Sequence, residues 1–565
     1  MRISCSPMLR FLALAVVTLT LSASQAGAAV RLPNVFGNHM VLQREKPVTV
    51  WGWAEPGEKV TLTFAGQTRT VVAVDSGDWK IQLEPLKTSF EGRELTVTGS
   101  DSHITITDVL VGEVWLCGGQ SNMEWTLRAS RDADVEIPSA DSPAIRFLRM
   151  PKIARQFPQT DFPVRNPDSG GRDWQRAIPE EVENCTGVGY YFARRLQRRL
   201  KSPVGLIDTS WGGTMAQHWV TKKTLRKIAE VQPYFDRFQE QLDAWNEGGG
   251  ADGARQRYEV DLRKWETERA AARADGRKEP RRPSSAAYGN PAHKGQPGGM
   301  FNGVIAPVAQ FTLRGIVFYQ GENNSFTVGW KPFPETFPAV FRDWREAFGE
   351  ATLPIGIIQI AGWSNRRSMT YDMNHHTNII REVQHLTWQR TPGTGLIVTF
   401  DTNSNGSIHP GRKLPVGERS ARWALAEVYG VRARNSDQPL EWRGPLYQSM
   451  AIADGRITIS FSSGTDRGLR LDQDVALGFY IAGEDREFHV AQARITTDAM
   501  KKSHIVVWHD DVRNPVAVRY AWSNLPLGSV MNARELPAYP FRTDDWPLVP
   551  HQSTGAYHVN PEPSG

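Results

Sequence analysis

The segment that decides the fold is residues 114–123, which read Val-Trp-Leu-Cys-Gly-Gly-Gln-Ser-Asn-Met. A continuous apolar run of this kind is typical of a strand buried on both faces of a parallel sheet. Ser121 follows two glycines at the point where a helix begins, which places it at the carboxyl edge of the sheet, where ligands bind in open α/β folds. The segment predicts an α/β fold and a candidate nucleophile. A helix N-cap is the alternative role for Ser121, and spacing alone does not decide between them.

Further apolar runs of strand length follow along the chain, with helical patterns among them. The apolar runs occupy residues 204–208, 315–319, 355–360 and 395–400, and the helical patterns occupy 190–200, 333–348 and 414–429. Unbroken apolar strands that alternate with helices indicate a parallel sheet covered by helices on both faces. We therefore expect the residues that carry the chemistry to follow the ends of these strands.

The two ends of the chain have a different pattern, made of short alternating strands and turns. A chain of 565 residues is also longer than one hydrophobic core usually supports. We expect an N-terminal β-sandwich region over residues 30–107, the α/β domain over 108–433, and a C-terminal β-sandwich, jelly-roll-like region over 434–550.

Residues 225–290 form an insertion with a helical pattern of its own. Apolar residues recur at helical spacing before and after three consecutive glycines at 248–250. The glycines end the first helix, and the two apolar stripes predict a helical hairpin that packs through them. Packing explains these stripes better than a binding surface does.

The first residues are typical of an export signal. Arg2 and Arg10 precede an apolar run at 11–21, and Ala-Gly-Ala at 26–28 fits a cleavage site. A membrane anchor is the alternative, but it needs about 20 apolar residues. We expect residues 1–29 to be a signal peptide and the protein to be periplasmic or extracellular in a bacterium.

The composition excludes several classes of function. The formal net charge is +5, and the basic residues are spread along the chain, so neither a nucleic-acid surface nor a further membrane span is expected. The sequence contains no HExxH or CxxC metal spacing, no P-loop and no dinucleotide fingerprint, so we expect no metal and no cofactor. Cys117 and Cys185 remain after removal of the signal peptide, and whether they pair stays open.

A nucleophilic serine needs a base, and His409 is the best candidate. It lies in the segment between the predicted strand at 395–400 and the helix at 414–429, again at the carboxyl edge of the sheet. A histidine in this place can accept the proton of a serine that lies at the same edge. Packing or surface exposure is the ordinary role of a lone histidine, so spacing alone leaves this assignment open.

Four sequence blocks resemble a known family. They are Gly-Gln-Ser-Asn-Met at 119–123, Ser-Trp-Gly-Gly-Thr at 210–214, Tyr-Gln-Gly-Glu-Asn-Asn at 319–324 and Ile-His-Pro-Gly-Arg-Lys at 408–413. In this order they resemble the sialate O-acetylesterase family of the SGNH hydrolases, and also bacterial carbohydrate acetylesterases that act on plant polysaccharides. Smaller matches occur at 302–307, 381–384 and 540–544. The resemblance implies a three-layer SGNH-hydrolase fold.

The resemblance also implies a serine esterase mechanism. Ser121 would attack an acetyl carbonyl, and His409 would transfer the proton. SGNH enzymes commonly carry an acid three residues before the histidine, but that position here is Gly406. We therefore expect Asp401, the nearest upstream acid, to orient the imidazole, with a backbone carbonyl as the alternative.

The remaining roles concern the oxyanion and the cleft. We expect the oxyanion to be bound by the backbone N–H groups of Ser121 and of Gly212 or Gly213, and by a side-chain amide. Gln320 is preferred over Asn324 for that amide. The residues expected in the cleft or next to it, besides Asn324, are Glu322, which braces its loop, and Trp211, Trp219 and Trp363.

The expected activity is removal of O-acetyl groups from an oligo- or polysaccharide. On resemblance alone, hemicelluloses of the xyloglucan or xylan type are favoured over sialic acid. Three alternatives stay open: a sialate O-acetylesterase, a non-catalytic carbohydrate-binding protein, and an enzyme that cleaves another bond, such as a lipase or a peptidase.

Overall fold

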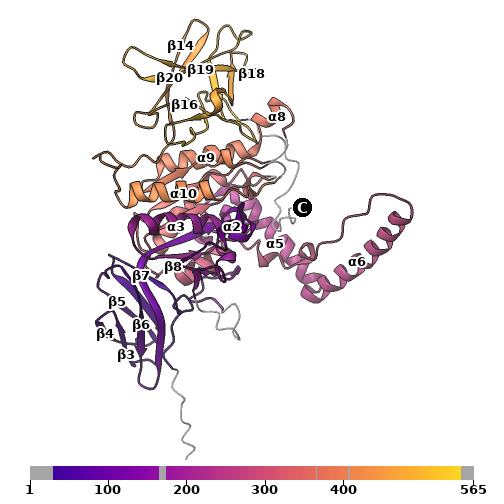
Figure 1. Ribbon diagram of the computed structural model, residues 1–565. Coiled ribbons are helices and arrows are strands. Elements are labelled where there is room, and N and C mark those ends of the chain that lie inside the picture. Colours follow the sequence, from indigo (N-terminus) through magenta and orange to yellow (C-terminus); the bar gives the residue numbers. More distant parts are fainter. Residues whose placement is uncertain (1–28, 164–173, 327, 364–365, 405–406, 549–565) are drawn as a thin grey trace, which may run out of the picture.

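The structure is a computed structural model, shown in Figure 1. It describes residues 29–163, 174–326, 328–363, 366–404 and 407–548. All but the last residue of the expected signal peptide lie outside the described residues. In Figure 1 an α/β body occupies the middle of the molecule, with one β region on either side of it.

The body is built on one sheet with the strand order β13-β12-β11-β7-β10-β8-β9. Its strands are β7 (His103–Gly119), β8 (Ser142–Arg149), β9 (Gln175–Ala177), β10 (Val204–Asp208), β11 (Gly315–Tyr319), β12 (Ile355–Ile358) and β13 (Thr394–Ile397). All neighbours in this order pair in parallel except β8 and β9. The predicted α/β fold with a parallel sheet is therefore confirmed.

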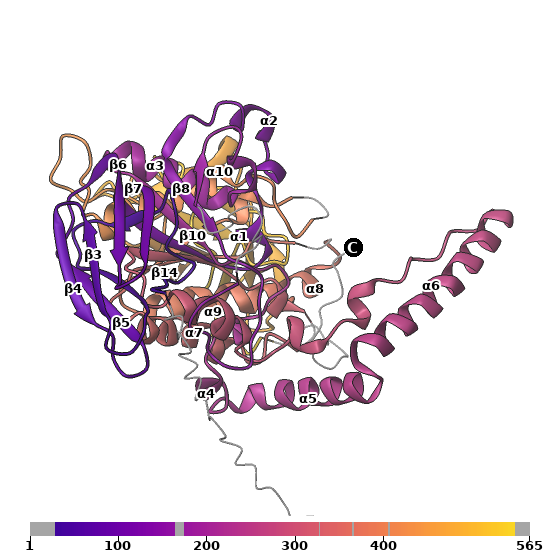
Figure 2. The same cartoon turned by 90° about the horizontal axis from the view of Figure 1, so that it is seen from below.

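Helices cover both faces of this sheet, which makes three layers. Helices α3 (Gly187–Leu200) and α10 (Leu414–Trp423) lie together on one face, and α7 (Phe333–Ala347) and α9 (His376–Arg390) lie on the other (Figure 2). The α10 helix packs closely because Gly356 has no side chain: a Cβ there would lie 2.6 Å from the Trp423 ring. The apolar strand residues are buried between these two layers.

Strand β7 joins the N-terminal β region to the body. Its first part pairs with β6 (Ser89–Thr98), which pairs with β3 (Lys59–Phe64) and through it with β4 (Gln67–Val72). The remaining strands of this region are β1 (Val41–Gln43), which pairs with β7, and the pair β2 (Val48–Trp53) and β5 (Asp78–Leu83). Position 108, where we expected a boundary, lies inside β7, and Asp108 has a positive φ of 53° at an irregularity in the pairing with β6.

The C-terminal region consists of antiparallel sheets. One contains β14 (Tyr447–Ala453), β15 (Arg456–Phe461), β20 (Ser503–Trp508) and β19 (Gln492–Thr497), and another contains β18 (Phe488–Val490), β17 (Phe479–Ala482), β21 (Ala517–Tyr520) and β23 (Phe541–Arg542). A short pair, β16 (Arg470–Leu471) and β22 (Val530–Met531), completes it. Tyr539 attaches this region to the body, because its ring stacks on Trp388 and its hydroxyl donates to the Leu396 carbonyl at 3.0 Å.

The insertion differs from the expected hairpin. Helices α5 (Gln232–Glu247) and α6 (Gly250–Ala274) meet at Gly249, whose φ is +84°, and α6 then extends away from the molecule as an arm (Figures 1 and 2). The stripe of α6 faces the returning chain instead of α5: the Trp265 Nε1–H donates to the Pro280 carbonyl at 2.9 Å. The glycine corner turns the second helix away from the first, and an extended segment covers its apolar stripe.

The remaining short helices are α1 (Ser121–Glu124), α2 (Ala133–Glu136), α4 (Lys222–Leu225) and α8 (Met369–Met373). Cys117 and Cys185 are both buried as free thiols. Over the described residues, no helix combines the length and the apolar character that a membrane crossing requires.

Candidate active site

Ser121 is the first residue of α1, directly after the central strand β7. The turn that exposes it depends on Gly119, whose φ is +127°, and a Cβ at that position would lie 2.1 Å from the Tyr319 carbonyl oxygen. The Gln120 N–H donates to that same carbonyl at 2.9 Å, which fixes the start of the turn. The close approach of β7 and β11 thus holds the Ser121 backbone in place.

The structure brings His409 to Ser121 from the segment between β13 and α10. The distance from His409 Nε2 to Ser121 Oγ is 2.8 Å, and the imidazole stacks on Trp125 with ring centroids 5.1 Å apart. Burial lowers the pKa of His409, the Lys413 ammonium lowers it further, and Glu124 opposes the shift. The imidazole is therefore neutral near neutral pH and able to accept the serine proton.

Asp401 does not take the place that the sequence suggested. Both of its carboxylate oxygens accept hydrogen bonds from the Arg419 guanidinium of α10, at 2.7 and 2.6 Å. Among the residues that the structure describes, no carboxylate hydrogen-bonds to the His409 ring. Asp401 lies in a short 3₁₀ turn, Phe400–Thr402, that begins three residues after the end of β13, and Arg419 of α10 reaches it there to form the ion pair.

The second strand-end segment, after β10, lies against the nucleophile. A Cβ on Gly212 would be 3.1 Å from Ser121 Cβ, a tight contact, so the absence of a side chain eases this approach. The Gly212 N–H donates to Glu124 Oε2 at 2.5 Å, and Glu124 also pairs with Lys152. With the Gly212 N–H bound to Glu124, Gly213 is the one of the two glycines whose N–H remains for an oxyanion.

The side-chain amide of Gln320 is committed elsewhere. Its Nε2 donates to Gln120 Oε1 at 2.7 Å and to the Thr214 carbonyl at 2.8 Å, which uses both of its hydrogens. Gln320 is fully buried and ties the segments after β7, β10 and β11 together. In this arrangement neither hydrogen of the Gln320 amide is left for an oxyanion.

Asn324 is also structural, whereas its neighbour Asn323 reaches the site. The Asn324 Nδ2 donates to the Gly329 carbonyl at 3.0 Å, within its own loop. Asn323 is partly exposed, and its Nδ2 donates to the Gly213 carbonyl at 2.9 Å, which leaves its second amide hydrogen for a ligand. Sequence reasoning missed Asn323 because it shares its type with Asn324, and only burial distinguishes the two.

A buried polar network lies behind Ser121 and His409. The Asn122 Nδ2 donates to Glu322 Oε1 at 2.5 Å and to the Ile408 carbonyl at 3.0 Å, and Lys413 Nζ donates to Asn122 Oδ1 at 2.6 Å. Glu322 therefore does not touch the reacting groups directly. No sequence signal pointed to Asn122 and Lys413 beyond their presence in the 119–123 and 408–413 blocks.

The three tryptophans expected in the cleft have different environments. Trp219 is completely buried and donates from Nε1 to Thr214 Oγ1 at 3.1 Å, so it belongs to the core. Trp211 is buried beneath Lys294, whose Nζ lies 5.5 Å from the centre of the ring system. Trp363 is only partly buried and lies next to Phe326, and it is the one of the three whose ring surface is most open to a ligand.

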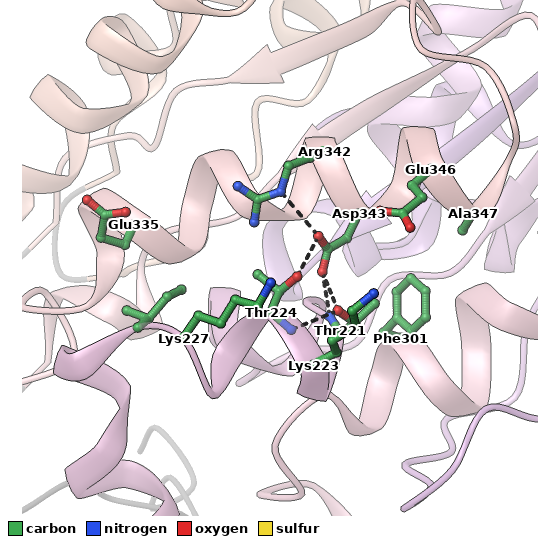
Figure 3. A pocket seen from close by; sticks show the side chains of 11 residues that line it. Thr221, Lys223, Thr224, Lys227, Phe301, Glu335, Arg342, Asp343, Glu346 and Ala347 are labelled. Atoms are coloured by element: carbon green, nitrogen blue, oxygen red, sulfur yellow. Dashed lines mark hydrogen bonds and ion pairs between the residues drawn. The ribbon is translucent and has the colours of Figure 1, made fainter.

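A pocket of about 760 Å³ lies between α4 and α7, apart from the serine and histidine (Figure 3). Asp343 occupies its wall and accepts hydrogen bonds from the Thr221 N–H at 2.8 Å and from the Thr224 hydroxyl at 2.9 Å. These bonds cap the start of α4. None of the site residues expected from the sequence lines this pocket.

One group of metal-ligating side chains lies together within the described part of the chain. The ligand atoms of His489, His509 and Asp511 are within 4.8 Å of one another, in the C-terminal β region. Ser121 and His409 are not members of this group.

Comparisons with known proteins match the chain over most of its length. A family model described as "Carbohydrate esterase, sialic acid-specific acetylesterase" matches residues 111–244. The sialate O-acetylesterase of Mus musculus is 25% identical over 534 residues, which cover 89% of this chain and 91% of that protein. The human sialate O-acetylesterase is 25% identical over 458 residues, which cover 76% of this chain and 75% of that protein.

A solved structure shows the same architecture. The carbohydrate acetylesterase XAC1771 from Xanthomonas citri superposes with a TM-score of 0.72 and is 28% identical, covering 92% of this chain and all of that chain. The resemblance to the sialate O-acetylesterase-like family that the four blocks predicted is thereby confirmed. The chain is an enzyme of the carboxylic-ester hydrolase class.

Proposed function

We propose that this enzyme removes O-acetyl groups from a carbohydrate through an acetyl-enzyme formed on Ser121. The observation that carries the proposal is the 2.8 Å contact between His409 Nε2 and Ser121 Oγ at the carboxyl end of the central strand. The names of the relatives supply the acetyl ester and the carbohydrate. A non-catalytic carbohydrate-binding protein would have no need of this contact.

In the first half of the reaction, the Ser121 Oγ attacks the acetyl carbonyl carbon while His409 Nε2 takes its proton. The negative charge that develops on the carbonyl oxygen is stabilised by the N–H groups of Ser121 and Gly213 and by the Asn323 side-chain amide. The C–O bond to the sugar then breaks, and the imidazolium gives its proton to the departing sugar oxygen. In the second half, His409 deprotonates a water molecule that attacks the acetyl-enzyme, and acetate leaves.

We propose that Ser121 and His409 act as a dyad. Stacking on Trp125 and the hydrogen bond from Asn122 to the Ile408 carbonyl support the position of the imidazole. The ion pair between Asp401 and Arg419 gives Asp401 a role in holding the start of this segment on α10 instead of a role in proton transfer.

For the substrate, we propose an acetylated hemicellulose of the xyloglucan or xylan type, on resemblance to bacterial carbohydrate acetylesterases. O-Acetyl sialic acid is the second candidate, and the names of the mammalian relatives favour it. We further propose that residues 1–29 are a signal peptide and that the enzyme acts outside the cytoplasm. Sequencing of the mature N-terminus after expression in a bacterial host tests the export proposal.

The deciding experiment is acetate release from acetylated xyloglucan, acetylated xylan and O-acetyl sialic acid, comparing the wild type with Ser121→Ala. Release from one substrate that disappears in the variant supports the mechanism and identifies the sugar. A correctly folded wild type that releases no acetate from any of them contradicts the proposed activity and directs the search to other esters.

A further inference from the structure

The structure buries a lysine ammonium directly behind the proposed catalytic pair. Lys413 is only 2% exposed, although it lies just before α10 and four residues after His409. Its Nζ donates to Asn122 Oδ1 at 2.6 Å and lies 5.6 Å from the Trp125 ring centre and 5.7 Å from that of Tyr319. Burying an ammonium group is costly unless its interactions compensate, so this arrangement calls for a functional explanation.

Asn122 connects this lysine to both members of the pair. Asn122 follows Ser121 in the chain, and its Nδ2 donates at 3.0 Å to the carbonyl of Ile408, the residue before His409. The amide cannot turn over, because its oxygen faces an ammonium that only donates, and its nitrogen faces a carbonyl and the Glu322 carboxylate, which accept. Lys413 and Glu322 therefore fix the amide from its two sides.

Trp125 provides a second connection. Its ring stacks on the His409 imidazole at 5.1 Å with an interplanar angle of 25°, and the same ring lies against the Lys413 ammonium. The Trp125 Nε1–H donates to the Ala129 carbonyl at 2.7 Å, which holds the indole in this orientation. No carboxylate among the described residues binds the His409 ring, so these contacts support the imidazole on Ser121 together with the hydrogen bond from the His409 backbone N–H to Ser407 Oγ at 3.0 Å.

We propose that Lys413 is a positioning residue for His409, acting on it through Asn122 and Trp125 in the place that an acidic third member holds in a Ser-His-Asp triad. This inference rests on the proposed role of Ser121 and His409. It adds a buried cation, where a triad has an anion, as the group that sets the orientation and the charge environment of the base.

The electrostatics agree with this geometry. Burial is the largest cause that lowers the pKa of His409; the Lys413 ammonium lowers it further, and Glu124 of α1 raises it. Burial lowers the pKa of Lys413 itself to about 7, and Glu322 opposes that shift. The negative charge of the Asp401 carboxylate is offset by its ion pair with the Arg419 guanidinium. The Lys413 side chain is therefore a charged ammonium at acid pH, and that is where it favours the neutral imidazole of His409 most strongly.

The test is the rate at which a fluorophosphonate probe labels Ser121, measured as a function of pH in the wild type, Lys413→Met and Lys413→Gln. In both variants the loss of the cation raises the pKa of His409. We therefore expect the fall in labelling rate at acid pH, the acid limb of the profile, to shift to higher pH by about 0.5–1 pH unit. Lys413→Met also loses the hydrogen bond to Asn122, and we expect its plateau rate to fall by about 10-fold. Lys413→Gln keeps an N–H donor, and its plateau should fall less.

Lys46→Met is the matched control, because Lys46 pairs with Glu350 at the opposite edge of the sheet. It should leave the labelling profile unchanged. A folded Lys413→Met protein with the wild-type limb and plateau overturns the inference, and if that variant does not fold, an unmoved limb in Lys413→Gln overturns it instead. Failure of the acetylesterase proposal has a different signature: the wild type labels normally but releases no acetate. A wild type that the probe does not label contradicts both proposals.

Discussion

The parallel sheet buries one glutamate near the amino ends of its strands and another near their carboxyl ends, and the two carboxyl groups have opposite surroundings. Glu113 of β7, which pairs with Val204 at the start of β10, is fully buried and receives hydrogen bonds from Arg44, Arg314 and Gln43. Glu322, beside the carboxyl end, is 1% exposed and receives one from Asn122, while its Oε2 has no hydrogen-bond partner among the described residues.

The pKa values of the two carboxyl groups move in opposite directions for this reason. Burial raises the pKa of Glu113, but the Arg314 and Arg44 guanidinium groups outweigh it and hold the pKa below its usual range. At Glu322 burial dominates and raises the pKa, because its own backbone N–H, the Asn122 amide and the Lys413 ammonium compensate less. The surroundings of Glu113 therefore favour stability. Those of Glu322 leave a carboxyl group poorly compensated behind the reacting groups, as functional sites commonly do.

The largest expected effect is a loss of activity without a loss of stability, at Ser121 beside the carboxyl ends of the strands. Ser121→Ala removes the nucleophile, so kcat for acetate release should fall by roughly 10⁴-fold or more. The melting temperature should stay near that of the wild type, because only one hydroxyl is removed. Calorimetry with the activity assay checks both. Retained activity in this variant would place the chemistry elsewhere.

The reverse result, a loss of stability without a loss of activity, is expected at Glu113. Glu113→Gln leaves two guanidinium groups without their buried anion, which should lower the free energy of unfolding by about 3–5 kcal/mol. The activity per folded molecule should remain that of the wild type. Urea unfolding followed by circular dichroism measures the loss.

The pH dependence of that loss has a definite sign. The pKa of Glu113 is lowered in the folded protein, so its contribution to stability is present above the unfolded value and disappears as the pH falls through the folded value. Wild type and Glu113→Gln should therefore differ most near neutral pH and converge in acid. A difference that is constant with pH would mean that the substitution acts through packing alone.

Asn323→Ala tests which amide serves the oxyanion. Removal of one preorganised donor typically lowers kcat by about 10²–10³-fold, and we expect that loss here without a change in stability. Gln320→Ala is the matched comparison: it should lower stability, because the Gln320 amide joins three segments. If Gln320→Ala loses kcat while remaining as stable as the wild type, the original assignment from the sequence is right.

The sequence predicts the parts of the site that depend on local order along the chain. Ser121 and His409 each follow an apolar strand, and parallel strands bring their carboxyl ends to one edge, so their meeting needs no knowledge of side-chain contacts. The role of Asp401 depends on Arg419 of α10, which binds the carboxylate in competition with His409. Similarly, Asn323 and Asn324 are the same residue type in one turn, and only the packing of that turn buries one of them.

The fold shows the same limit. The strand pattern predicts the parallel sheet because burial on both faces is visible in composition, and the glycines at 248–250 predict where α5 ends. The direction in which α6 leaves depends on backbone angles at Gly249, and its apolar stripe is compatible with a helix or with an extended segment as its partner. Periodicity identifies a buried face but not what covers it.

The smallest expected effect concerns Asp401. Asp401→Asn removes the charge that Arg419 binds, while the amide oxygen can still accept one hydrogen bond from the guanidinium. If Ser121 and His409 form a dyad, kcat should change by less than about 3-fold, since Asp401 does not touch the imidazole. Stopped-flow assays with p-nitrophenyl acetate, compared with Arg419→Gln, measure this. Both variants should loosen the same segment and so resemble each other, whereas a large loss in Asp401→Asn alone would mean that the carboxylate leaves Arg419 during the reaction and restores the triad.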